Sequence, residues 1–107
     1  MKDKEIYKMH ANICKVLANP LRIEIIDIIN DSELSFSEIQ ERTNTLKSNL
    51  SQHLSLMVSN GILLSRKIGI NSFFSLSSHK VAKACQIMRD VLIDNIKNKM
   101  KLLNQNR

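Results

Sequence analysis

The feature that most restricts the fold is a pair of short helical segments, which are followed by a change of hydrophobic period. Ser35-Phe36-Ser37-Glu38 matches a capping box, in which a hydroxyl and a carboxylate three residues apart bond the free N–H groups of a helix start. Asn44-Thr45 interrupts the helical pattern, and Asn60-Gly61 ends the second segment, since glycine readily adopts the left-handed conformation. Residues 35–60 therefore predict a helix-turn-helix.

The segment from about residue 62 to 76 predicts a β-hairpin. Ile62-Leu63-Leu64 and Ser72-Phe73-Phe74-Ser75-Leu76 suit two short strands, and Ile68-Gly69-Ile70-Asn71 supplies glycine and asparagine for the turn between them. A hairpin directly after a helix-turn-helix is a wing. Arg66 and Lys67 make one arm of this wing basic.

Long amphipathic helices are predicted at both ends of the chain, at about residues 4–18 and 78–104. Between them, Asn19-Pro20 starts another helix, because asparagine is a good cap and proline suits the first helical position. In the last helix apolar residues recur at close to every 3.5 positions: Val81, Cys85, Met88, Leu92, Ile96, Met100 and Leu103. Such a narrow apolar seam requires a partner helix, so we expect a homodimer through the first and last helices. The alternative is a monomer whose terminal helices pack on their own core.

The distribution of charge points to a polyanionic partner. The net charge is +6, and the 48 residues from Arg42 to Arg89 contain no Asp or Glu but seven Lys and Arg. Residues 1–41 carry eight acidic and five basic groups. A surface that faces nucleic acid avoids carboxylates, which repel phosphate. A chance run on a mildly basic protein is the alternative explanation.

The predicted fold class is mainly α with a β-hairpin wing: a winged helix-turn-helix with five helices. A chain of 107 residues suits one domain, so we expect residues 1–107 to form a single DNA-binding domain. No apolar run approaches the roughly 20 residues needed to cross a bilayer, and Met1–Lys15 does not resemble a signal peptide. We therefore expect a cytoplasmic protein without a membrane partner. No catalytic constellation is visible, so we do not expect an enzyme.

Four segments in order resemble the ArsR/SmtB winged-helix repressors. Val16–Ile23 is similar to the family's "LxxPxRxxIL" opening, Leu46–Leu54 to its "SxxSxHL" recognition helix, Asn60–Leu63 to its "xxGLV" segment, and Phe73–Leu76 to the return strand of the wing. The resemblance covers about residues 10–95. It implies a dimer on a roughly palindromic operator, usually a repressor that a small inducer releases.

The resemblance and the geometry of helix-turn-helix docking identify the candidate DNA contacts. The helix after the turn enters the major groove with its N-terminal half foremost. Asn49 and Gln52 can address an adenine edge, and Ser48 and Ser51 suit phosphate oxygens. The full candidate set is Lys47, Ser48, Asn49, Ser51, Gln52 and His53 on this helix, with Arg66, Lys67 and Asn71 on the wing. Lys47 suits a phosphate or a guanine, and His53 has a packing or capping role as its alternative.

No inducer site follows from the sequence. Ser35–Ile39 lacks the cysteine pair of the metal-sensing members, and Ser77, Lys80, Val91 and Asp94 do not make the zinc site of others. His79 is read as an exposed residue or a cap. We therefore predict neither a cofactor nor a metal, and the inducer is unknown.

Cys14 and Cys85 lie 71 positions apart, and the cysteine positions of the persulfide sensors correspond to Asp27 and Ile93 here. The simplest interpretation of the two thiols is a pair of buried, unreactive side chains. A redox switch is the other, since the helices that carry them are expected to pack together in the dimer. Two alternatives to an inducible repressor stay open: a winged-helix protein–protein interaction module without DNA binding, and a repressor with no inducer site.

Overall fold

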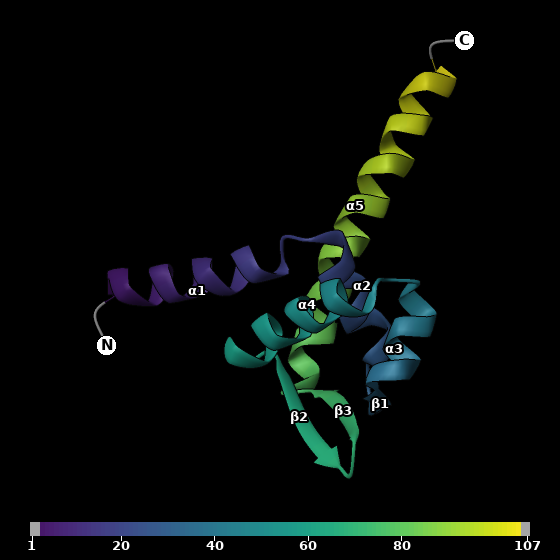
Figure 1. The fold of residues 1–107 in the computed structure, drawn as a ribbon. Helices are drawn as coiled ribbons and strands as arrows, with labels where there is room; N and C mark the ends of the chain where they lie inside the picture. Colours follow the sequence, from purple (N-terminus) through teal and green to yellow (C-terminus); the bar gives the residue numbers. More distant parts are fainter. Residues whose placement is uncertain (1–2, 106–107) are drawn as a thin grey trace.

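The structure is a computed structural model that describes residues 3–105. Its elements, in chain order, are α1 (Asp3–Leu17), α2 (Pro20–Ile29), β1 (Leu34–Ser35), α3 (Phe36–Thr43), α4 (Lys47–Ser59), β2 (Leu63–Ile68), β3 (Asn71–Leu76) and α5 (His79–Gln105). The body consists of α2, α3, α4 and the small sheet, and α1 and α5 project from it in different directions (Figure 1). The predicted class, a mainly helical winged helix-turn-helix, is confirmed.

Local chemistry starts two of the helices where the sequence predicts. The side chain of Asn19 accepts a bond from the Arg22 N–H at 3.2 Å, and Pro20 occupies the first turn of α2. At α3 the Ser35 hydroxyl accepts from the Glu38 N–H at 3.1 Å, and the Glu38 carboxylate accepts from the Ser35 N–H at 3.0 Å. The capping box is therefore complete, and it fixes where the helix-turn-helix begins.

The wing has three strands, one more than the sequence predicts. β2 and β3 form the expected antiparallel hairpin, and β1 pairs with the other edge of β3, with Leu34 opposite Phe74. A strand of two residues has no hydrophobic period, so the sequence pattern does not show it. The hairpin loop is only Gly69 and Ile70, and Gly69 takes a φ of +61°. Glycine accepts this left-handed conformation at little cost.

The core lies where α2, α3, α4 and the sheet meet. Its buried apolar side chains are Val16, Ile25, Ile26, Ile29, Leu34, Ile39, Leu50, Leu54, Met57, Ile62, Leu63 and Phe74. Val81, Ala82 and Cys85 at the start of α5 pack against its outside. Because α4 is held by three of these buried side chains, its opposite face is free to meet a partner.

The two terminal helices contribute almost nothing to this core. Val16 is the single buried residue of α1, and α5 has none along its 27 described residues. The radius of gyration is 17.1 Å, whereas a compact domain of this length has about 13 Å. No helix within residues 3–105 has the length and apolar character to cross a membrane. Apart from Val81, Ala82 and Cys85 at the start of α5, most of the apolar surface of α1 and α5 therefore has no partner within residues 3–105.

Replacing Leu50 with alanine should lower the free energy of unfolding by about 2–5 kcal/mol, because Leu50 is fully buried in α4 and truncation leaves a cavity. Leu46, one turn earlier, is 79% exposed, so Leu46→Ala should change stability by less than about 0.5 kcal/mol. Urea unfolding at one fixed protein concentration measures both values. Equal losses from the two variants would contradict this placement of the core.

Candidate nucleic-acid interface

The turn before α4 is set by a small polar network. Asn44 ends α3 with a left-handed φ of +51°. The Thr45 hydroxyl donates to the Thr43 hydroxyl at 2.9 Å, and the Gln40 amide donates to the Thr45 carbonyl at 3.3 Å. These bonds determine the direction in which α4 leaves α3. The turn between the two helices is therefore held by side-chain bonds as well as by the backbone.

Three of the candidate residues on α4 point away from the core. Successive helical residues are about 100° apart, so Ser48, Asn49 and Gln52 lie roughly opposite the buried Leu50 and Leu54. All three are exposed. The first turn contains no acidic residue, and its N-cap position has no side-chain hydrogen bond. This end of α4 therefore offers N–H donors and polar side chains to a partner.

A groove brings four further candidates together from distant parts of the sequence. Lys47 and Ser51 of α4 line it together with Lys67 and Asn71 of the wing. Residues at the end of β1 and in α3 also line it: Ser35, Phe36, Ser37 and Gln40. We call this concavity the wing groove. It carries two lysines and no carboxylate, so its field favours an anionic partner.

Arg66 does not line the wing groove but forms an ion pair with Glu33. Its Nε and Nη2 atoms donate to the two carboxylate oxygens of Glu33 at 2.7 and 2.6 Å. The guanidinium also lies over the ring of Phe73, 5.4 Å from its centre. The hydrogen bond from Arg66 lowers the pKa of Glu33. Although residues 42–89 contain no Asp or Glu, the fold therefore places the carboxylate of Glu33 beside Arg66.

His53 is engaged on the flank of α4 that faces α2. Its Nδ1 accepts a hydrogen bond of 3.0 Å from Nε of Arg22. The same guanidinium donates through Nη1 to the carbonyl of Val16 at 2.9 Å. Arg22 thereby joins the end of α1 to α2 and to α4. Partial burial, and then the charge of Arg22, lower the pKa of His53. This contact fits the packing role that the sequence left open for His53.

Two exposed apolar residues beside this surface were not singled out from the sequence. Ile70, at the tip of the wing, is 95% exposed and borders the wing groove, and Leu46, at the start of α4, is 79% exposed. An apolar residue inside a turn that otherwise calls for polar residues is the signal that could have identified Ile70. Apolar side chains at such places can contact sugars or base edges.

Neither cysteine forms a disulfide, and their surroundings differ. Cys14 is exposed on α1, whereas Cys85 is half-buried against the core. Burial raises the pKa of the Cys85 thiol, which reduces its reactive thiolate fraction. Within residues 3–105 no three His, Cys, Asp or Glu side chains cluster closely enough to hold a metal ion. His79 is exposed, as expected, and its Nδ1 lies 2.6 Å from Asp31.

Comparison with known proteins places this surface in a family context. Residues 19–65, which contain the helix-turn-helix, match the model of the family described as "Bacterial regulatory protein, arsR family". The transcriptional activator HlyU of Vibrio cholerae is 33% identical over 76 residues, which cover 71% of this chain and 70% of HlyU. The arsenical resistance operon repressor of Staphylococcus xylosus is 32% identical over 71 residues, covering 66% and 68% of the two chains.

A solved structure extends the similarity over most of the chain. The crystal structure of Mycobacterium tuberculosis Rv0081 superposes with a TM-score of 0.80 at 27% identity. The superposition covers 89% of this chain and 96% of Rv0081. Rv0081 is known as an uncharacterized HTH-type transcriptional regulator. The similarity therefore includes the wing and the terminal helices as well as the helix-turn-helix.

The Arg22–His53 contact predicts that acidification destabilises the fold. The pKa of His53 is lower in the folded chain than in the unfolded one, where it is about 6.5. The resulting stability is present above the unfolded value and is lost as the pH falls through the folded value. Protonation also blocks Nδ1 as an acceptor for Arg22. Between pH 7.5 and 5.5, urea unfolding should therefore show stability that falls with pH.

His53→Gln should flatten this pH dependence, because an amide oxygen still accepts from Arg22 but does not titrate in this range. His10→Gln is the matched control, since His10 is exposed on α1. An unchanged slope in His53→Gln, or a flattened one in His10→Gln, would assign the pH dependence to another group.

Proposed function

Because this chain belongs to the ArsR family of bacterial regulatory proteins, we propose that it is a dimeric repressor of an inverted-repeat operator, released by an inducer. The family assignment makes it a DNA-binding transcriptional regulator and not an enzyme. Repression is the sense named for the arsenical operon relative, whereas HlyU is named an activator. Binding to the bacterial chromosome requires that the protein act in the cytoplasm.

The homodimer is supported by the apolar side chains that one chain leaves exposed. On α1 these include Ile6, Met9 and Ile13, each about half exposed. On α5 they are Ile87, Met88, Val91, Leu92, Ile93, Ile96, Met100, Leu102 and Leu103. Monomeric proteins rarely expose apolar stripes of this extent. A two-fold pair of chains buries them and presents two copies of α4 to the two halves of an inverted repeat.

The division of roles on DNA follows from the direction of each side chain. Ser48, Asn49 and Gln52 point outward from α4, so they meet base edges and nearby phosphates in the major groove. Lys47, Ser51, Lys67 and Asn71 line the wing groove and hold the backbone that borders it. Ile70 joins this surface at the wing tip. His53 is left out of the base-reading set because Arg22 occupies it.

The observation that carries the proposal is the wing groove itself. Lys47 and Lys67 are 20 positions apart in the sequence, yet they line one concavity beside the exposed face of α4. Arg66 adds to it when a phosphate replaces Glu33 as its partner, since the pair is exposed. A module that had lost DNA binding would have no reason to keep this surface free of carboxylates.

Gln52→Ala should weaken binding by roughly 1–3 kcal/mol on the cognate operator and little on unrelated DNA, because a lost base contact removes discrimination. Lys67→Ala should weaken binding to all sequences about equally and reduce the salt slope by about 1.8, because the proposed dimer loses one phosphate contact in each of its two copies. Anisotropy titrations with the DNA upstream of the protein's own gene, over a series of salt concentrations, measure both effects.

The salt dependence of DNA binding by the wild-type protein distinguishes the proposed repressor from a protein–protein interaction module. Affinity that falls steeply with salt is expected of a DNA-binding dimer. Lys97→Gln is a control, because Lys97 is exposed in the C-terminal half of α5 and does not line the wing groove. Absence of salt-sensitive binding would favour the protein–protein module. Identical behaviour of Gln52→Ala and Lys67→Ala would contradict the division of roles.

Glu33→Gln should strengthen binding to every DNA sequence and steepen the salt slope by about 1.8, because Arg66 then becomes available to a phosphate in both copies of the proposed dimer. Glu41→Gln removes an exposed carboxylate from the end of α3 and is the matched control for net charge. Weaker binding by Glu33→Gln alone would mean that the ion pair positions the wing and that Arg66 is not a DNA contact.

Binding of an inducer is one way to release the repressor from DNA. Thiol oxidation or persulfidation at Cys14 and Cys85 is the alternative. A disulfide between them requires Cα atoms within about 7 Å, in one chain or across the dimer. The exposure of Cys14 favours its modification, whereas the raised pKa of Cys85 disfavours attack by that thiol. A repressor without any inducer site is the third possibility.

Cys14 should react faster than Cys85 with a thiol-specific chromogenic reagent, because only Cys14 is exposed. The wild type, Cys14→Ser and Cys85→Ser are compared for DNA binding before and after treatment with a disulfide-forming oxidant or a polysulfide. Release that both variants abolish would establish a two-thiol switch. Binding that ignores the oxidant in all three proteins would eliminate the switch and leave the cysteines as packing residues.

A further inference from the structure

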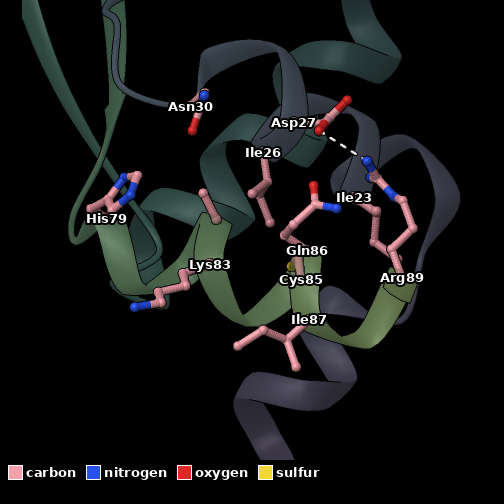
Figure 2. A pocket seen from close by; sticks show the side chains of 11 residues that line it. Ile23, Ile26, Asp27, Asn30, His79, Lys83, Cys85, Gln86, Ile87 and Arg89 are labelled. Carbon is pink, nitrogen blue, oxygen red and sulfur yellow. Dashed lines mark hydrogen bonds and ion pairs between the residues drawn. The ribbon is translucent and has the colours of Figure 1, made fainter. Parts of the chain in front are cut away.

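A cavity opens between α2 and α5, away from the residues assigned to DNA (Figure 2). We propose that it binds a small organic anion with an apolar body, and that its occupation weakens DNA binding. The cavity has a volume of about 500 Å³, within the usual range of roughly 300–1,000 Å³ for ligand sites. The binding claim stands by itself, and only the regulatory claim rests on the proposed function.

The inner wall of the cavity is apolar. Ile26 of α2 is buried, and Ala82 and Cys85 of α5 pack against the core beside it. The thiol of Cys85 is held in its neutral form by burial, which raises its pKa. Ile23 and Ile87 extend the apolar wall toward the opening. A ligand must therefore present an apolar body to fill this part of the cavity.

The rim carries a surplus of positive charge. Lys83 and Arg89 outnumber the one carboxylate of the lining, Asp27. Arg89 gives Asp27 a single N–H, from Nη1 at 3.1 Å, and both side chains are partly exposed. A guanidinium has five N–H donors, so Arg89 retains donors for a carboxylate. An exposed ion pair contributes little stability, so an anion can compete with Asp27 for Arg89.

Two amides complete the polar part of the lining. Figure 2 shows Gln86 between Ile26 and the Asp27–Arg89 pair, and Asn30 and His79 at the other end of the cavity. The Gln86 amide already donates to the Asp90 carboxylate at 3.1 Å. Within residues 3–105 the Asn30 amide and the Lys83 ammonium have no side-chain partner, so these two groups are available to fix the orientation of a ligand.

The cavity and the apolar stripe of α5 share part of their residues. At about 100° per residue, Cys85 of the inner wall lies on the same face of α5 as Met88 and Leu92, and Ile87 belongs both to the lining and to the exposed apolar residues. Lys83, on the charged rim, lies on nearly the opposite face from Met88 and Leu92. A second copy packed on α5 therefore borders the cavity at Ile87, and Lys83 of the charged rim faces away from the stripe.

Arg22 links the cavity to the proposed DNA-binding helix. It lies next to Ile23 in the sequence, and its guanidinium bonds His53 of α4 and the carbonyl of Val16 at the end of α1. A ligand that separates α2 from α5 and replaces Asp27 as the partner of Arg89 thus acts on α2. This helix is bonded to both α1 and α4 through Arg22. Any shift of α2 changes the position of α4 relative to α5 and hence to the dimer axis.

The binding claim is tested with benzoate as the anionic probe and benzamide as its neutral counterpart of the same shape. In an NMR titration of the full-length protein, benzoate should give saturable shifts of the backbone amides of residues 23–30 and 82–89. Benzamide should bind roughly tenfold more weakly, the effect of one charge-assisted hydrogen bond. Absence of saturable benzoate shifts at these residues, or equal binding of both probes, would overturn the assignment.

Two variants test the site from different sides. Arg89→Gln should weaken benzoate binding about tenfold and leave benzamide unchanged, because it removes charge but little volume. Ala82→Leu should abolish binding of both probes by filling the cavity. Lys97→Gln, on α5 but outside the cavity, is the control and should bind benzoate like the wild type. Loss of binding in Lys97→Gln, or none in Ala82→Leu, would place the probe elsewhere.

The regulatory claim is tested by DNA titrations with and without saturating benzoate. Benzoate should lower the DNA affinity of the wild type several-fold and have no effect on Ala82→Leu. Site-specific benzoate binding without any change in DNA affinity would overturn the regulatory claim. Failure to bind DNA even without benzoate would instead overturn the proposed function. The NMR titration would still test whether the cavity binds benzoate.

Discussion

The two terminal helices have almost no place to bury apolar surface within one chain, and much of the architecture depends on this. Helix α5 is 27 residues long without a buried residue, and α1 buries only Val16. Isolated helices are marginal in water and gain most of their stability from packing of an apolar face. Burying a large apolar side chain contributes about 1.5–3 kcal/mol. In the proposed homodimer a second copy supplies this burial, and the two-fold symmetry sets the distance between the two α4 helices.

Within one chain, Arg22 connects three of the helices. Its bonds to the Val16 carbonyl and to His53 join α1, α2 and α4 at one point. Helix α2 also lines the cavity together with α5. It therefore contacts both the proposed ligand site and α4, the proposed DNA-binding helix. Under the proposed regulation, a ligand that displaces α2 acts on α4 directly through the Arg22–His53 bond.

Three ion pairs connect the stretch without Asp or Glu, residues 42–89, to acidic residues elsewhere in the sequence. Each joins an acidic residue before Arg42 to a basic residue after Ser65: Asp27 to Arg89, Asp31 to His79 and Glu33 to Arg66. The fold thus neutralises the basic residues near α2 and the strand edge. Lys47 and Lys67, which lie on the other side, have no such partner among residues 3–105. The wing groove therefore keeps the charge of both of its lysines.

Local structure could be predicted from the amino-acid sequence. Asn19, Pro20, the Ser35–Glu38 capping box and Gly69 act within a few residues of themselves, so helix starts and the hairpin turn could be predicted. The outward face of α4 followed from helical periodicity. Tertiary structure alone decided the third strand, the Arg22–His53 bond, the Glu33–Arg66 pair and the cavity. These contacts join residues 31 to 62 positions apart, and only packing of the core brings such residues within reach.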